Sequence, residues 1–128
     1  MAEKIRPLAM FPDEFGKMLE LCYETFHMLQ AMLMTDSSRR LRDIKENCRH
    51  VVNVWDSFKF KFHRHKELVD QPYTSNSWVL ARDLEKEVHG IWMFLKYRVN
   101  KFRFEELESL QRNFAALIML IDPTAPPL

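Results

Sequence analysis

Residues 41–62 have the sequence LRDIKENCRHVVNVWDSFKFKF. Apolar side chains recur in it at alternating steps of three and four residues, the heptad spacing of a helix that is packed along its length. This 41–62 stripe consists of Leu41, Ile44, Cys48, Val51, Trp55, Phe58 and Phe62. The end of the segment also alternates Phe and Lys with period two, as a strand would. Because the heptad spacing continues to Phe62, we expect one long helix over about residues 38–66.

Three further helices are expected around this one. Residues 12–34 begin with Pro-Asp-Glu, which suits a first helical turn, and continue with amphipathic spacing. Residues 77–101 follow a loop that contains Pro72, and residues 103–121 end at Asp122-Pro123. The sequence therefore predicts an all-α fold in a single domain that covers residues 1–128.

The two central helices are joined by a short loop, so residues 38–101 are expected to form a long antiparallel hairpin. Each arm would be about 35–40 Å long. The hairpin carries more apolar surface than one inner seam buries, including Val52, Phe60 and the run Trp92-Met93-Phe94. Two solutions remain open: two copies pair their hairpins into a four-helix bundle, or one chain buries the surface itself as a monomeric bundle.

The composition excludes several classes of function. The chain has only two glycines, which argues against phosphate-binding loops, and no paired Ser, His and Asp, so neither an enzyme nor a cofactor is expected. Cys22 and Cys48 are too few for a disulfide scaffold or a zinc site. No apolar run approaches the roughly 18 residues of a membrane helix, so no membrane insertion is expected. The net charge of +1 requires any nucleic-acid contact to be local or to lie outside this chain.

Two polar clusters lie near the predicted end of the second helix. His63 and His65 are two residues apart, so they point to different faces, and we predict no metal site from them or from His89. The second cluster is basic: Lys59, Lys61, Arg64 and Lys66. We interpret it as a solvated surface, with RNA contact as the alternative.

Four segments in order carry a resemblance to a known family: Leu8–Phe15, Val52–Phe58, Ile91–Leu95 with Phe102, and Glu105–Pro127. They resemble, in that order, the opening of the second helix, the tryptophan-bearing arm of the spike, the aromatic lower part of the other arm, and the last helix with its proline-rich strand in the core (capsid) proteins of hepatitis B virus and its relatives. The resemblance covers nearly the whole chain, and the order and spacing of the segments carry it. The compact chain is most similar to the capsid proteins of the fish nackednaviruses.

The resemblance implies a structural protein of the virion capsid. Two helical hairpins would pair into a dimeric spike, and dimers would join through residues 103–128 into an icosahedral shell around the viral genome. Assembly would take place in the cytoplasm or nucleus of the host cell. Contact with viral nucleic acid would use a basic tail that is not present in this chain. The alternative function is a helical-bundle interaction module, such as a host adaptor or an RNA-binding viral suppressor.

The resemblance also assigns residues to two interfaces. The expected dimer interface comprises Leu41, Ile44, Cys48, Val51, Trp55, Phe58, Trp92 and Leu95. The expected contact between dimers comprises Phe114, Leu117, Ile118, Ile121, Pro123, Pro126 and Pro127. For Trp55 and for the end of the last helix, burial within the chain's own core is the competing interpretation. Val54 stands where the family has a cysteine beside the tryptophan, which leaves Cys48 as a candidate for a disulfide across the twofold axis.

Overall fold

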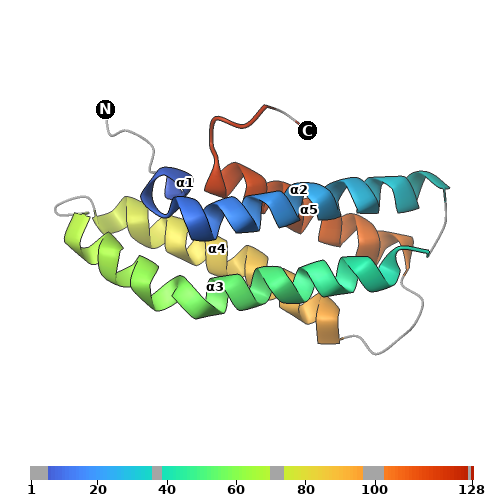
Figure 1. Cartoon of the computed structure of the whole chain (residues 1–128), viewed down its shortest axis with the longest axis horizontal. Coiled ribbons are helices and arrows are strands. Elements are labelled where there is room, and N and C mark those ends of the chain that lie inside the picture. Colours follow the sequence, from blue (N-terminus) through green and yellow to red (C-terminus); the bar gives the residue numbers. More distant parts are fainter. Residues whose placement is uncertain (1–5, 36–38, 70–73, 97–102, 127) are drawn as a thin grey trace.

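Helices make up almost all of the described part of the chain (Figure 1). The computed structural model describes residues 6–35, 39–69, 74–96, 103–126 and 128, and for residues 65–69 and 74–78 it describes the backbone alone. The helices are α1 (Pro7–Met10), α2 (Pro12–Thr35), α3 (Leu41–Val69), α4 (Thr74–Lys96) and α5 (Phe104–Ile121). No strand occurs within these ranges, which confirms the predicted all-α class.

The helix boundaries follow the sequence signals closely. The expected starts at 12 and 103 are observed at Pro12 and Phe104, and α5 ends directly before Asp122. The alternating Phe-Lys segment is helical, because α3 continues to Val69. The single turn α1 was not predicted, and residues 97–101 of the expected third helix lie outside the described residues.

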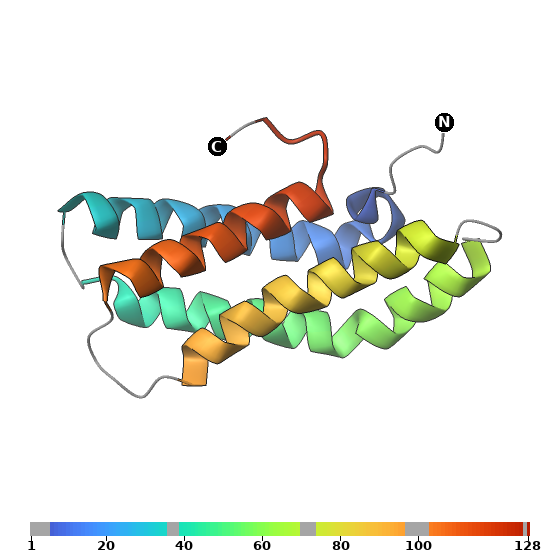
Figure 2. The ribbon, with the colours of Figure 1, turned by 180° about the vertical axis from the view of Figure 1, so that it is seen from behind.

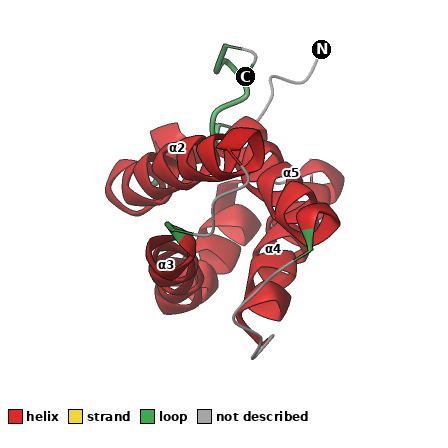
Figure 3. Cartoon of the chain, turned by 90° about the vertical axis from the view of Figure 1, so that its right-hand side faces the viewer, coloured by secondary structure: helices red, strands yellow, loops and turns green. Residues whose placement is uncertain are grey.

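The four long helices form a closed ring of contacts. Each one packs against two others, in the pairs α2 with α3, α3 with α4, α4 with α5, and α5 with α2. Consecutive helices run in opposite directions, as Figures 1 and 2 show, and the end-on view of Figure 3 shows the four helices surrounding a common centre. One chain therefore supplies all four helices of a bundle.

An aromatic cluster joins the first part of α2 to α3. The rings of Phe15 and Phe58 meet edge to face, with centroids 4.9 Å apart, and Trp55 lies 5.5 Å from Phe58 in a similar arrangement. Phe11, between α1 and α2, packs 6.0 Å from Phe62. Each such aromatic pair contributes about 0.5–1.5 kcal/mol beyond the burial of its area. This cluster explains why the Leu8–Phe15 segment stays next to α3.

A small polar contact lies further along the α2–α3 interface. Thr25 is fully buried, and its hydroxyl donates a 2.7 Å hydrogen bond to the carbonyl oxygen of Leu21. The Asn47 side-chain amide in turn donates to the Thr25 hydroxyl over 3.1 Å. Because a buried polar group is costly without its partner, this bond favours one register of α2 against α3.

The residues just before α1 and just after α5 lie next to each other. Asp122, which follows α5, accepts a 2.6 Å hydrogen bond from the Thr124 hydroxyl and lies 3.8 Å from the Arg6 guanidinium just before α1. The Thr124 hydrogen bonds and the Arg6 charge hold the pKa of the Asp122 carboxyl below its usual value. The contact therefore keeps the start of α1 next to the end of α5.

Candidate interaction surfaces

The 41–62 stripe lies inside the chain's own bundle. All seven of its side chains are buried, and Trp55, Ile44 and Cys48 have no exposed surface. The stripe packs against other helices of the same chain, so it offers no surface to a second copy in this fold. The following residues of the expected dimer interface therefore lie in the core of the single chain: Leu41, Ile44, Cys48, Val51, Trp55 and Phe58.

The apolar residues assigned to contacts between dimers are also in the core. Phe114, Leu117, Ile118 and Ile121 on α5 have no exposed surface, because α5 packs between α2 and α4. The competing interpretation, that α5 folds back on its own bundle, describes what is observed. Among the prolines of the tail, Pro123 is half-buried, Pro126 is exposed, and Pro127 lies outside the described residues.

Trp92 is the residue of the predicted dimer interface that remains clearly accessible. Its side chain is 39% exposed, while Leu95 is partly buried against the core. The Lys96 ammonium lies 3.8 Å from the centre of the Trp92 ring, and the His89 ring lies 5.5 Å away on the preceding turn. These neighbours hold a large aromatic ring at the surface of α4.

A shallow hollow of about 450 Å³ surrounds Trp92 between α3 and α4. We call its lining the α3–α4 outer face, and it consists of Val52, Asp56, Lys59, Glu85, Val88, His89 and Trp92. The Lys59 ammonium lies 3.2 Å from the Asp56 carboxylate and 3.9 Å from that of Glu85 on α4. The surface thus combines a partly exposed aromatic ring with charges of both signs, above the buried side chains of Val52 and Val88.

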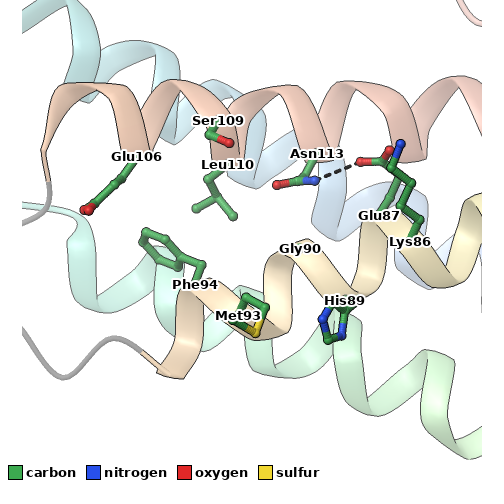
Figure 4. Close-up of a pocket in the computed structure, with 10 residues that line it drawn as sticks. All are labelled: Lys86, Glu87, His89, Gly90, Met93, Phe94, Glu106, Ser109, Leu110 and Asn113. Atoms are coloured by element: carbon green, nitrogen blue, oxygen red, sulfur yellow. Dashed lines mark hydrogen bonds between the residues drawn. The ribbon is translucent and has the colours of Figure 1, made fainter.

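A second hollow, of about 380 Å³, lies between α4 and α5 and is drawn in Figure 4. Its apolar lining comes from Met93, Phe94 and Leu110. At one end the Asn113 amide donates a 2.8 Å hydrogen bond to the Glu87 carboxylate. We call this hollow the α4–α5 groove.

Gly90 sets the closest approach of the two helices at this groove. A Cβ atom added to Gly90 would lie 2.6 Å from the Asn113 amide nitrogen, well inside van der Waals contact. Apart from the scarcity of glycine, no feature of the sequence distinguishes Gly90. A glycine between apolar residues of a helix, as Gly90 is between Val88 and Ile91, is the signal that would have revealed a close helix crossing.

The two cysteines are both buried, as free thiols. Burial raises the pKa of the Cys22 thiol well above its ordinary value, and the neighbouring Cys48 raises it further. Burial likewise raises the pKa of Cys48 to about 12, although the charge of Arg49 acts in the opposite direction. Cys48, the candidate for a disulfide across a twofold axis, is therefore a buried thiol close enough to Cys22 to act on its charge.

The basic cluster is largely paired within the chain where it is described. Lys59 contacts Asp56 and Glu85 as above, and the Lys61 ammonium lies 3.5 Å from the Glu14 carboxylate of α2. Arg64 is exposed, and the side chain of Lys66 lies outside the described residues. Lys59 and Lys61 therefore act mainly as bridges between helices, which weakens the case for an RNA site at this cluster.

The described residues offer neither a metal site nor a membrane span. No three His, Cys, Asp or Glu side chains among them are grouped so that they could hold an ion. Within the same residues, no helix has an apolar stretch of the length needed to cross a bilayer.

No family model matches the chain, and no curated protein or solved structure matches it at a significant level.

Proposed function

We propose that this chain is a structural subunit that self-associates, first into dimers and then into a closed shell, in the manner implied by its resemblance to the hepatitis B core proteins. One observation carries the proposal. After the bundle has buried the 41–62 stripe, the large aromatic Trp92 is still exposed beside Val52 and Val88 on the α3–α4 outer face. Tryptophan anchors of this kind are enriched at protein interfaces.

The α3–α4 outer face also has the charge pattern of a self-complementary surface. A twofold axis brings each patch onto its own copy, so a patch with charges of both signs can pair with itself. Lys59 lies between Asp56 and Glu85 in one chain, and in a dimer it has the same carboxylates of the second copy as further partners. Two α3–α4 pairs joined in this way form an intermolecular four-helix arrangement, which is the hairpin spike expected from the sequence.

The contacts between dimers are proposed to use the surface at the end of α5 instead of its buried residues. Met119 is 46% exposed on α5, and the tail after it carries Pro123, the exposed Pro126 and Leu128, which is 52% exposed. A proline-rich tail is extended and loses little entropy when it docks on a neighbour. Weak contacts are sufficient to hold a closed shell together, because each subunit makes several of them at once.

Light scattering coupled to size exclusion, followed by electron microscopy at raised salt, tests the proposal. We expect dimers at low salt and uniform hollow particles when salt screens the charges between dimers. Trp92→Ser should shift the protein toward monomer and prevent particles. The control is Met34→Ser, which removes an apolar side chain that is 80% exposed on α2 and should leave assembly unchanged. A protein that stays monomeric at all concentrations and salt levels would contradict the proposal.

A further inference from the structure

The positive charge of the chain is concentrated on α3. Over its whole length, Leu41–Val69, this helix contains seven Lys and Arg and four Asp and Glu, a net charge of +3 in a chain whose total is +1. By contrast, α2 (Pro12–Thr35) contains one Lys and four Asp and Glu, a net charge of −3. Such segregation of charge produces a strong local potential that the overall composition conceals.

Three arginines on α3 are turned to solvent. Arg42, Arg49 and Arg64 are all exposed, and none of them forms an ion pair with another described residue. They therefore differ from Lys59 and Lys61, whose ammonium groups already contact carboxylates of the same chain. Their guanidinium groups remain available to an anionic partner.

An exposed aromatic ring lies in line with these arginines. Phe60 is 77% exposed, and steps of 7, 11 and 4 residues from Arg42 to Arg49, Phe60 and Arg64 return to nearly the same side of a helix with about 3.6 residues per turn. We call this line of four residues the arginine crest, and it is about 33 Å long. Asp43, Glu46 and Asp56 are exposed acidic residues within the same length of helix.

We infer that the arginine crest binds single-stranded nucleic acid. Guanidinium groups pair with phosphates, and an exposed ring among them offers a surface on which an unpaired base can stack. A duplex buries its base faces, so Phe60 would have no partner there, which favours a single strand. The inference does not need the proposed assembly, because none of the four crest residues lines the α3–α4 outer face. The two surfaces adjoin at Lys59, whose ammonium lies 5.8 Å from the centre of the Phe60 ring.

Fluorescence anisotropy with a labelled 20-nucleotide oligouridylate, measured from about 25 to 200 mM salt, tests the inference. Three phosphate contacts on a single strand predict that log affinity falls with log salt with a slope of about −2. The double variant Arg42→Gln/Arg49→Gln should reduce the magnitude of that slope by about 1.4. Phe60→Ser should weaken binding by about tenfold without changing the slope.

The matched control is Lys17→Gln/Arg112→Gln, which removes the same charge from exposed positions on α2 and α5. Equal losses in the two double variants would show that only net charge matters, and would overturn the inference. Absence of binding at 25 mM salt would overturn it as well.

The competing occupant of the crest is the acidic α2 side of a second copy. Sedimentation velocity at low salt, without RNA, separates the two cases. If Arg42→Gln/Arg49→Gln abolishes self-association and leaves the RNA affinity unchanged, the crest contacts protein and the inference fails. If it lowers RNA affinity and leaves the sedimentation coefficient unchanged, the inference stands.

Discussion

The inner and outer sides of the α3–α4 pair differ sharply in how they are used. On the inner side, the 41–62 stripe and residues such as Leu84 and Ile91 are fully covered by other helices of the same chain. On the outer side, Trp92 is 39% exposed above two valines and several charges. The larger apolar pattern thus stabilises the fold, and the smaller remainder is available for a partner.

This difference leads first to a prediction about the thiols of the inner side. Burial of Cys22 and Cys48 keeps both thiols protonated, so alkylation by iodoacetamide at pH 8 should require unfolding. We expect labelling to be slower than in the guanidinium-unfolded chain by a factor of at least about 10³. Because folding raises both pKa values, stability should also fall above about pH 9, where the unfolded thiols ionise. Rapid labelling of the native protein would show that the bundle opens at this point.

The second prediction concerns Trp55. Its removal by Trp55→Ala should lower the free energy of unfolding by about 3–5 kcal/mol, because it leaves a cavity in the aromatic cluster. Trp55→Phe is the matched control, since the buried indole N–H has no hydrogen-bond partner among the described residues and its loss should cost little. Urea denaturation measures both variants. If Trp55→Ala changed only the dimer affinity, the stripe would belong to an interface after all.

The core of the bundle contains features that could be predicted from the sequence and one that could not. Heptad spacing, Pro12 and Pro123 were sufficient for the class of fold and for most helix ends. They could not identify the partner of the 41–62 stripe, because a seam between helices of one chain has the same spacing as a seam between chains. The four helices had enough apolar faces to close a ring within one chain, and that outcome moved Trp55 and Phe114 into the core.

The outer surface was harder to predict than the core. Trp92 could be predicted as part of an interface, because three consecutive apolar residues on a helix cannot all lie on one buried face. Glu85 and His89 were missed as members of that surface, because charged and polar residues on an exposed helix carry no periodic signal. The crest was missed for a related reason: 14 residues, about four helical turns, separate Arg49 from Arg64, and charges of both signs lie among them.

The third prediction tests the α4–α5 contact. Gly90→Ala should destabilise the protein by about 1 kcal/mol, because the new methyl group displaces Asn113 and breaks its hydrogen bond to Glu87, which exceeds the gain in helix propensity. Gly16→Ala is the control: its nearest neighbour is a Leu8 methyl group at 4.0 Å, so it should stabilise the protein by about 0.5–1 kcal/mol. Thermal unfolding followed by circular dichroism compares the two. Equal shifts would show that the close approach at Gly90 is unimportant.

The fourth prediction concerns Trp92 on the outer side, where we expect the smallest effect on stability. Trp92→Ser should lower the free energy of unfolding by less than about 1 kcal/mol, in contrast to Trp55→Ala, because its ring is 39% exposed and both of its ring contacts, His89 and Lys96, lie on the same helix. Urea denaturation at a concentration where the protein is monomeric is the appropriate measurement. A loss comparable with that of Trp55→Ala would mean that both sides of the α3–α4 pair belong to one core.

The closed ring of helices has a consequence for how the chain folds. Three of its four contacts join consecutive helices, and such local pairs form rapidly because little loop entropy is lost. The α2–α5 contact, which joins the first and last long helices, has to wait until both are made. We expect it to form late, together with the Arg6–Asp122 contact at the ends of the sequence. A chain released from synthesis would then bury its apolar stripe within itself before it meets a second copy, so misassembly of half-folded subunits is disfavoured.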